Sequence, residues 1–351
     1  MSVAEEITLT ADRVRAITAE ILERSGMNTD DARIVADALA WADLRGLAAQ
    51  GIGKLPLIVR RIRAGGTAAN ATLEVVADAP SFARVDAHRA WGHVAGVRAM
   101  RMAIAKAKAT GIGTVVVGNT DSASSLGYYA ELAGRERLIG FAINDGTPLM
   151  PPPGGTTRVV GNQAFALCAP AGKYAPLLFD SALSAISWTH IEELRDRGEP
   201  LREGLALDPS GRPTTDHAAA IAGMLLPMGA HRGFGLALMW EVLTGVLSKN
   251  ARIASAITPL AELAGPQSVA HFYLAIDPST LMKYDEFTSR VDALIDAVHA
   301  SPPAAGVARV FVPGEQGYAA SARRERDGIA VSADRAREVA AIASELGVAW
   351  P

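Results

Sequence analysis

A glycine-rich segment at residues 229–235 carries side chains that could bind an anion. It reads Gly-Ala-His-Arg-Gly-Phe-Gly and opens a strongly apolar stretch with the composition of a helix. The first N–H groups of a helix have no partners within it, and the helix dipole adds partial positive charge there, so a phosphate is attracted. His231 and Arg232 would add donors, and Gly233 would let the backbone approach. A phosphate site is the functional interpretation, and close packing of a helix end is the structural alternative.

A second candidate is the tight turn Pro313, Gly314 and Glu315, which follows an apolar segment at 308–311 that predicts a strand. By composition alone an ordinary turn is the favoured interpretation. The glycine fingerprint of a standard dinucleotide-binding fold, G-x-G-x-x-G after an early strand, does not occur in the chain. These residues therefore indicate an α/β enzyme without assigning its activity.

Other kinds of catalytic centre find little support in the sequence. The single cysteine, Cys168, lies in an apolar stretch and is expected to be a buried thiol, which excludes a disulfide framework and a cysteine-based metal cluster. No histidines share metal-ligand spacing on one face, and the nucleophile elbow of a hydrolase is absent. No metal site is therefore predicted. Surface or packing roles are expected for His88, His93, His190, His217, His271 and His299.

Composition describes an ordinary soluble protein with a large core. The chain has 351 residues, 49% of them hydrophobic and 20% charged, and a formal net charge of -3. Its basic residues are scattered among acidic ones, so no nucleic-acid partner is expected. The N-terminus lacks the features of a signal peptide, and the apolar helical stretch at 234–247 is too short to span a membrane. A cytoplasmic protein without a membrane partner is the expectation.

Hydrophobic periodicity predicts helices in the first third of the chain and an α/β pattern in the middle. Thr10 has the residue type and position of a helix cap. Alternation of strands and helices between residues 113 and 143 predicts parallel strands joined by helical crossovers. Helices are expected at 11–26, 29–39, 55–62, 90–110, 126–137, 216–224, 233–248 (buried), 285–299 and after 332, and strands at 72–76, 82–85, 113–117, 139–143, 271–276 and 308–311.

Short blocks along nearly the whole chain, in the expected order, resemble those of one oxidoreductase family. That family contains malate, L-lactate, L-sulfolactate, ureidoglycolate and 2,3-diketogulonate dehydrogenases or reductases, together with piperideine- and pyrroline-2-carboxylate reductases. The blocks are WADLRG at 41–46, GYYA at 127–130, PGG at 153–155, DSA at 180–182, GRPTTD at 211–216, HRGFGLAL at 231–238, DP at 277–278 and PGE at 313–315.

The resemblance implies a mixed-sheet α/β fold without the Rossmann fingerprint, a homodimer with active sites at the subunit interface, and NADH or NADPH as cofactor. The substrate would be a small 2-keto or 2-imino acid, or the corresponding hydroxy or amino acid. The resemblance also implies three parts of the chain. They are a helical substrate and dimerisation part at 1–80, an α/β cofactor-binding part at 81–250, and a C-terminal part at 251–351 that packs back on both. The implied cofactor contacts are Asn144, Asp180, Ser181, Ala182, His231, Arg232, Gly233, Pro313, Gly314 and Glu315, and the implied contacts with a carboxylate substrate are Arg45, Lys54 and Gly146.

The chain departs from this family where proton chemistry takes place. The family's Ser-His-Gly is Ala49, Gln50 and Gly51 here, and glutamine can orient a carbonyl but cannot act as an acid at neutral pH. Four residues later a common arginine is Lys54, whose point charge binds a carboxylate with less directional preference. In the second loop Ser122 takes the place of a histidine that some members use as their base.

Hydride transfer to a ketone also needs a proton, so the lost histidines leave the proton source open. Gln50, Ser122 and Asp180 are the expected catalytic residues, with Asp180 able to act through water. Asp121 could be a base, although a capping or turn role is favoured. One hypothesis is an active reductase, either of an imine, which accepts hydride without a strong acid beside it, or of a ketone with proton delivery through water. The alternatives are a family enzyme with non-redox chemistry and a nucleotide-binding paralogue without turnover.

Overall fold

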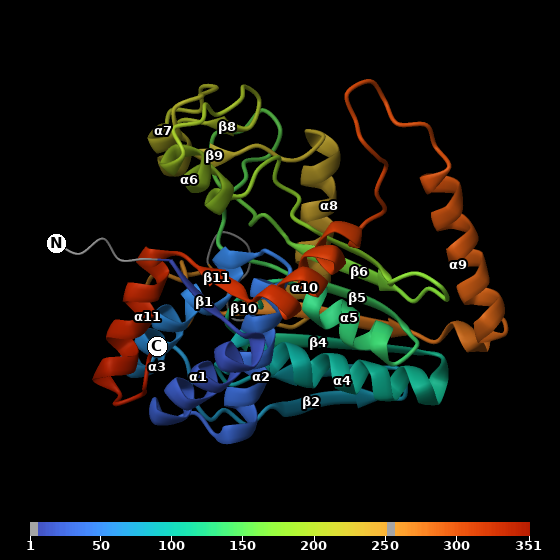
Figure 1. The fold of residues 1–351 in the computed structure, drawn as a ribbon, viewed down its shortest axis with the longest axis horizontal. Coiled ribbons are helices and arrows are strands. Elements are labelled where there is room, and N and C mark those ends of the chain that lie inside the picture. The colour runs from blue at the N-terminus through green and yellow to red at the C-terminus, as the bar shows by residue number, and fades with distance from the viewer. Residues whose placement is uncertain (1–5, 251–256) are drawn as a thin grey trace.

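A computed structural model of the protein describes residues 6–250 and 257–351. Its centre is a seven-stranded sheet with the strand order β2-β3-β4-β10-β5-β6-β7 (Figure 1). β10 comes from late in the sequence but lies in the middle of the sheet, so it ties the C-terminal third of the chain to the central part. The strands are β2 (Glu74–Ala79), β3 (Phe82–Asp86), β4 (Ile112–Thr120), β5 (Ile139–Asn144), β6 (Phe165–Ala169), β7 (Leu177–Ser181) and β10 (Val269–Ile276).

The sheet is mixed, as predicted, but its strand pairing differs from the expectation. A parallel crossover occurs instead between β3 and β4, which are connected through α4 (Gly92–Thr110). β4 and β5 do not pair, because β10 lies between them and runs antiparallel to both. The prediction of parallel pairing is wrong at this point. An apolar run indicates that a strand is buried on both faces, but it does not identify the neighbours of that strand.

Helices cover both faces of the sheet. α4 and α5 (Gly127–Arg135) pack on one face, where buried side chains of both helices meet those of β4, β10 and β5. Gly113 in β4 permits this close approach, since a Cβ at that position would lie 2.0 Å from the carbonyl oxygen of Ala103 in α4. The other face meets α8 (His231–Glu241), the π-helical turn η3 (Val242–Val246) and a small lobe. That lobe contains α6 (Trp188–Asp196), α7 (His217–Ala222), β8 (Ala206–Leu207) and β9 (Met224–Leu225).

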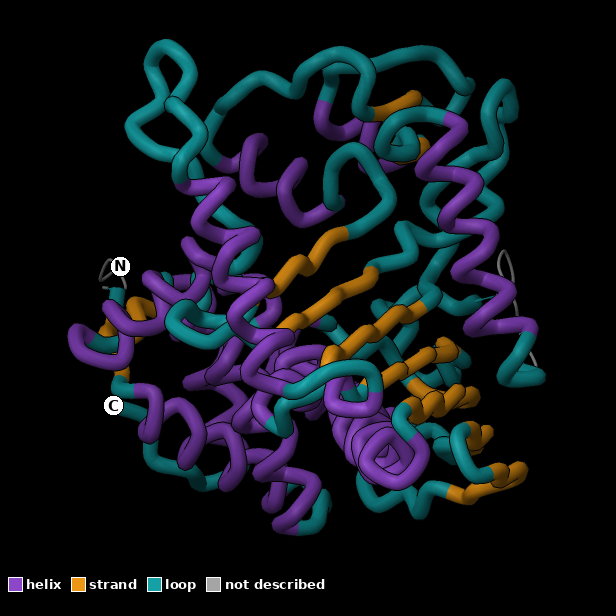
Figure 2. Tube along the Cα trace, turned by 90° about the vertical axis from the view of Figure 1, so that its right-hand side faces the viewer, coloured by secondary structure: helices purple, strands orange, loops and turns teal. Residues whose placement is uncertain are grey.

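A helical layer at the side of the sheet joins the two ends of the chain. Its core contains side chains from α1 (Ala11–Arg24), α2 (Thr29–Leu44), α3 (Leu55–Ala64) and α11 (Ala333–Glu345). β1 (Ile7–Leu9) pairs antiparallel with β11 (Ile329–Val331), which fixes the two ends together. The predicted cap is confirmed, because the Thr10 side chain accepts a hydrogen bond from the Arg13 N–H. Figure 2 shows the strands side by side with most helices gathered along one side of them.

Two further expectations are corrected in the C-terminal half. Residues 308–311 form no strand, but an extended loop between α9 (Tyr284–His299) and α10 (Glu315–Asp327). The helix expected at 233–248 exists as α8 and η3 but is not buried as predicted, because it exposes several large apolar side chains. Apolar composition alone does not separate a core helix from one whose apolar face lies at the surface. No helix in the described residues is long and apolar enough to cross a membrane.

Candidate active site

The C-terminal end of β7 places Asp180 against the start of α5. Asp180 Oδ2 accepts a hydrogen bond of 2.7 Å from the Gly127 N–H, and acidic groups are favourable at this end of a helix. β7 is also held by the predicted turn at 313–315, because the Leu178 N–H donates to the Pro313 carbonyl oxygen at 3.1 Å. These contacts bring several predicted site residues to one cavity of about 710 Å³. Its lining includes Trp41, Arg45, Leu47, Asp180, Pro313 and Gly314.

The Asp180 carboxyl group has a raised pKa, although it is mostly ionised at pH 7. Burial raises the pKa of Asp180 to about 6, while the Gly127 N–H and the charge of Arg45 act in the opposite direction. A carboxyl group with such a pKa can accept or release a proton near neutrality. The sequence predicted Asp180 as a site residue. In the structure it lines a cavity from which a ligand could reach it.

Arg45 lines the same cavity, but its charge is already compensated. It forms an ion pair of 2.9 Å with Glu131, and the two side chains are only 7% and 9% exposed. Its guanidinium also stacks between the rings of Trp41 and Tyr318, while the Trp41 indole N–H donates to the same glutamate. Glu131 was not singled out from the sequence. An arginine held this way shapes the wall of the cavity, and little of its charge is left for a substrate.

Gln50 and Lys54 lie on two short 3-10 turns, η1 (Ala48–Gln50) and η2 (Ile52–Lys54), that precede α3. The Lys54 ammonium donates to Gln50 Oε1 at 2.5 Å and to Ser124 Oγ at 3.1 Å. Burial of the ammonium lowers the pKa of Lys54 to about 8. In the described residues no carboxylate forms an ion pair with Lys54. The two loops that the sequence analysis predicted to be altered meet here.

Asp43 in α2 holds this turn in place. Its Oδ2 accepts a hydrogen bond of 2.7 Å from the Ile52 N–H. The fit is tight, because a Cβ at Gly51 would lie 1.8 Å from Asp43 Oδ1. Burial raises the pKa of Asp43 to about 6, partly offset by the Ile52 N–H and by Arg335 and Arg324. The sequence contained a signal for Asp43, since it is the acid of the WADLRG block, but gave it no role.

The loop after β4 presents Ser124 rather than Ser122 to Lys54. The Ser122 N–H donates to Gln267 Oε1 at 2.8 Å, and its hydroxyl accepts a hydrogen bond of 3.4 Å from the Ser124 N–H. Ser124 has a left-handed backbone with φ 60, which turns the chain so that its hydroxyl reaches the ammonium. Ser122 thus lies in the expected loop, while its neighbour makes the contact with Lys54. Counting along the sequence cannot locate such a turn.

Asp121 in the same loop is part of a buried structural pair. It forms an ion pair of 3.0 Å with Arg61, whose side chain is 0% exposed. Thr67 donates a short hydrogen bond to the second carboxylate oxygen. The remaining Arg61 donors reach backbone carbonyl oxygens at 66, 260, 262 and 265. These contacts fit the structural interpretation of Asp121 and leave it little opportunity to act as a base.

Two neighbouring histidines are buried, and one of them, His93, lies near Lys54. The indole N–H of Trp91 donates to His93 Nδ1 at 2.7 Å, so the proton of His93 is assigned to Nε2. Burial, the charge of Lys54 and the neighbouring His271 lower the pKa of His93 to about 3. His271 is similarly buried and has a pKa of about 3. The sequence suggested packing roles for both, which this geometry supports. The sequence gave no sign that His93 lies near Lys54.

The predicted cofactor segments on the other face of the sheet lie side by side. The Met228 N–H donates to the Leu183 carbonyl oxygen at 2.8 Å, and the Ala185 N–H donates to the Leu226 carbonyl oxygen at 2.7 Å. The strand end carrying Ser181 and Ala182 therefore adjoins the start of α8 at His231, Arg232 and Gly233. His231 and Arg232 are exposed and Gly233 is buried. The first helical N–H groups and two basic side chains thus lie next to Asp180's strand.

The loop at Asn144 and Gly146 adjoins this arrangement. A Cβ at Gly161 would lie 2.7 Å from the Gly146 carbonyl oxygen, so the loops at 144–146 and 161–163 are tightly packed. Asn144 Oδ1 and Gln163 Oε1 are buried acceptors without a hydrogen-bond partner in the described part of the chain. A buried acceptor without a donor is costly, and a ligand bearing N–H or O–H groups would satisfy it. These residues fit a polar cofactor beside the strand ends.

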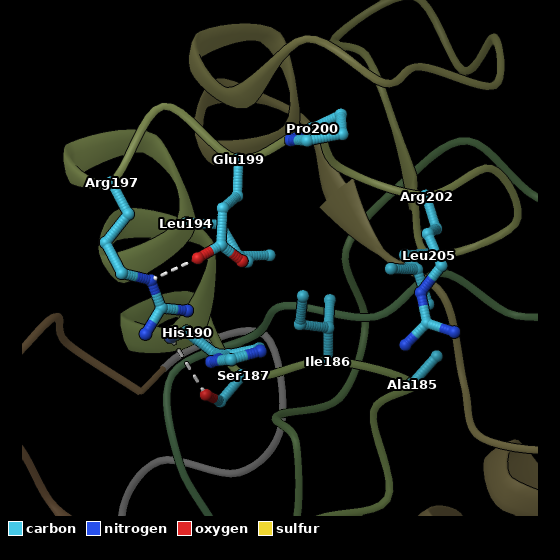
Figure 3. Close-up of a pocket in the computed structure, with 10 residues that line it drawn as sticks. All are labelled: Ala185, Ile186, Ser187, His190, Leu194, Arg197, Glu199, Pro200, Arg202 and Leu205. Atoms are coloured by element: carbon cyan, nitrogen blue, oxygen red, sulfur yellow. Dashed lines mark hydrogen bonds and ion pairs between the residues drawn. The ribbon is translucent and has the colours of Figure 1, made fainter. Parts of the chain in front are cut away.

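A second large cavity, of about 740 Å³, is lined by residues between 185 and 205, which follow β7 in the chain (Figure 3). Figure 3 shows Arg197 and Glu199 on one wall and Arg202 on the opposite wall. Arg197 is paired with Glu199 at 2.9 Å. The cavity is lined by Ala185, Ile186, Ser187, His190, Leu194, Arg197, Glu199, Pro200, Arg202 and Leu205.

Glu315 is separated from its neighbours in the predicted turn. It contacts His299 at 3.0 Å, forms an ion pair with Arg309 and accepts from the Val312 N–H at 3.2 Å. It lines a different cavity of about 300 Å³, whereas Pro313 and Gly314 line the Asp180 cavity. Its contacts therefore stabilise the turn. Among the residues that the structure describes, no group of acidic, histidine or cysteine side chains could hold a metal ion.

Comparison with known proteins identifies the family. The pattern of the Malate/L-lactate dehydrogenase family matches residues 9–340. Malate dehydrogenase of Pyrococcus horikoshii is 33% identical over 97% of this chain and 96% of that protein. The Delta(1)-pyrroline-2-carboxylate reductase of Ancylobacter novellus is 30% identical over 96% of this chain and 98% of that protein. The solved sulfolactate dehydrogenase from Methanocaldococcus jannaschii superimposes with a TM-score of 0.91 at 31% identity, covering 97% and 98% of the two chains.

The chain therefore belongs to the malate/L-lactate dehydrogenase family, and it is an oxidoreductase with the mixed α/β fold of that family. The resemblance inferred from the short blocks is confirmed. Names among the relatives specify NADP(+) for one sulfolactate dehydrogenase and NAD(+) for one ureidoglycolate dehydrogenase.

Proposed function

We propose that this protein is an NADH- or NADPH-dependent reductase of a small 2-keto or 2-imino acid, with an altered proton-transfer site. The observation that carries the proposal is the convergence of the Gln50–Lys54 turn, the Ser124 loop and Asp180 at one end of the sheet. Ser124 and Gly127 are three residues apart, so their Cα atoms lie within about 11 Å of each other. We propose that the substrate binds beside this segment, near the Lys54 ammonium and the Asp180 carboxyl group.

Lys54 is the cation best suited to bind the substrate carboxylate. Its ammonium forms no ion pair in the described residues, whereas the charge of Arg45 is balanced by Glu131. We therefore assign the carboxylate to Lys54 and the wall of the pocket to Arg45. Gly146 fits a position close to the substrate, because a Cβ added to this glycine would have no neighbour within 4 Å and the surrounding space stays open.

The cofactor contacts follow the segments that adjoin β7. Asn144, Asp180, Ser181, Ala182 and the start of α8 would hold it, with Pro313 and Gly314 closing the far side of the Asp180 cavity. His231, Arg232 and Gly233 offer the donors and positive end of a helix that phosphates prefer. The cavity in Figure 3 would take the adenosine end. When bound, the reduced nicotinamide supplies the hydride.

Gln50 changes the chemistry that this site favours. Its amide can orient a carbonyl or imine group and hold Lys54, but it cannot give up a proton at neutral pH. A protonated iminium already carries its proton, so an imine substrate places the smallest demand on the altered site. One relative is named as a pyrroline-2-carboxylate reductase, and others as malate or sulfolactate dehydrogenases. Both substrate classes belong in the test.

We also propose that the protein works as a homodimer. α8 and η3 expose a group of large apolar side chains on one side, and such surfaces on soluble proteins usually form contacts with other chains. Phe179, next to Asp180, is 44% exposed as well, which would bring the dimer contact close to the site. The exposed residues are Leu236, Leu238, Met239, Val242, Val246 and Leu247.

The experiment that tests the function follows nicotinamide absorbance with a panel of 2-keto acids, alone and with methylamine. We expect oxidation of NADH or NADPH, faster with methylamine if imines are preferred. Cofactor titration is run beside it. A second candidate function is a nucleotide-binding paralogue without turnover, which is suggested by the glutamine at position 50 in place of the family's histidine. Tight cofactor binding without turnover of either panel would favour this candidate. No cofactor binding would contradict both.

A further inference from the structure

We infer that Lys54 is the proton donor of the reaction, taking over the role that the missing histidine has in the family. This inference rests on the proposed reductase function and identifies its proton source. It differs from the sequence expectation, which gave Lys54 only the binding of the substrate carboxylate.

The Lys54 ammonium keeps one N–H that makes no hydrogen bond within the described residues. An ammonium has three donors, and two are used by Gln50 Oε1 at 2.5 Å and Ser124 Oγ at 3.1 Å. Both acceptors are neutral, so they orient the ammonium without neutralising it. In a 2-keto acid the carboxylate and the keto oxygen lie on adjacent carbons. The remaining N–H can therefore contact the carboxylate and still reach the oxygen or nitrogen that receives the proton.

Other side chains near the site are poorer donors. His93 has a pKa of about 3, so it is neutral at physiological pH. Asp121 is held by Arg61 and Thr67. Asp180 has a pKa of about 6, so only roughly a tenth of it carries a proton at pH 7. Gln50 has no acidic proton in this pH range.

The protonation state of Lys54 suits the task. Burial lowers its pKa to about 8, so roughly nine-tenths of it is protonated at pH 7 while it remains a far stronger acid than an ordinary lysine. The charged and titratable groups on the elements packed around its turn are Asp43 on α2, Arg61 on α3 with Asp121, His93 on α4 and Arg335 on α11.

In the reduction of a ketone or an unprotonated imine, a hydride from the reduced nicotinamide forms a new C–H bond at C2, and the π electrons of the C=O or C=N bond move to the oxygen or nitrogen. An N–H bond of Lys54 breaks, and its proton forms the O–H or N–H bond of the hydroxy or amino acid. The nicotinamide is oxidised, the substrate is reduced, and neutral Lys54 regains a proton from water.

Lys54→Arg separates proton donation from carboxylate binding. Arginine keeps the positive charge but does not release its proton in this pH range. We expect kcat to fall about 100-fold or more while KM for the acid changes little, and the loss of wild-type activity above about pH 8 to disappear from the profile. Lys108→Arg, an exposed lysine paired with Glu136, is the matched control. A Lys54→Arg enzyme with wild-type kcat would overturn the inference.

A second readout needs neither cofactor nor turnover. The pH dependence of Lys54 acetylation by limiting acetic anhydride, followed by peptide mass spectrometry with Lys108 as reference, gives the pKa of the ammonium. We expect a midpoint near 8 in the wild type. A midpoint at or above 10 would overturn the inference even if the enzyme turns over. A midpoint near 8 in a protein that oxidises no cofactor with any acid would instead remove the proposed function.

Discussion

The Lys54 ammonium donates a hydrogen bond of 2.5 Å to the side-chain oxygen of Gln50, one helical turn earlier in the chain. The family resemblance predicts that this glutamine stands where the family has a histidine, so we propose that a residue that cannot carry a proton orients one that can. Ser124 completes the arrangement from the second altered loop. Two substitutions that look like losses in the sequence thus form one connected group in the fold.

Restoring the histidine should strengthen ketone reduction. In Gln50→His an imidazole can exchange a proton near neutrality, so we expect turnover of malate- or lactate-type keto acids to rise about tenfold or more. Cofactor affinity should stay the same. The measurement is kcat for both substrate panels, with cofactor binding by fluorescence titration. An unchanged kcat would contradict this prediction, because it would show that proton supply does not limit ketone reduction in the wild type.

The Arg45–Glu131 pair should behave as a structural element. Both side chains are almost fully buried, and removing one partner of such a pair costs about 3 kcal/mol or more. We expect this loss in urea unfolding for Glu131→Gln, with a smaller loss for Arg45→Met/Glu131→Gln than the sum of the single variants. Strict additivity would show that the two residues do not depend on each other.

Asp43 should make stability depend on pH in a defined direction. Its folded pKa is raised from 3.8 to about 6, so its favourable contribution is present below about pH 4 and is lost as pH rises through about 6. Relative to wild type, Asp43→Asn should therefore gain up to about 3 kcal/mol of unfolding free energy between pH 4 and pH 7. Urea unfolding at both pH values measures this change. A difference that does not vary with pH would contradict the assignment.

Arg202 should discriminate between the two cofactors. It faces the Figure 3 cavity from the wall opposite the Arg197–Glu199 pair, and NADPH differs from NADH by one 2′-phosphate. A charge-assisted hydrogen bond to phosphate is worth about tenfold in affinity. We expect Arg202→Ala to weaken NADPH by this factor and leave NADH unchanged. Arg195→Ala, which pairs with Asp196 outside the cavity, is the control. Equal weakening of both cofactors would place the phosphate elsewhere.

The sequence predicted much of this fold because its signals are local. The Thr10 cap and the periodicity of α4 each depend on a few neighbouring residues. The place of β10 between β4 and β5 could not be predicted, since pairing depends on contacts between residues more than a hundred positions apart. The exposed apolar side of α8 was misjudged for a related reason, because composition does not show what covers a helix.

The candidate site also contains residues that the sequence predicted and residues that only the structure shows. Gln50, Lys54 and Asp180 were predicted because they stand in or close to recognisable blocks. Ser124, to which the sequence gave no role, contacts Lys54 from a left-handed backbone conformation that the sequence does not reveal. Glu131 is buried beside Arg45, and His93 is buried near Lys54. A single sequence shows neither burial nor which residues are neighbours in space.

The most direct measurement is transfer of deuterium from the nicotinamide C4 position of labelled NADH or NADPH to a 2-keto acid, with and without methylamine, followed by mass spectrometry of the product. The account predicts a hydroxy or amino acid with deuterium at C2 and loss of this product in Lys54→Met. Cofactor that binds tightly while no acid in the panel acquires deuterium would contradict the central claim that this chain is a hydride-transferring reductase.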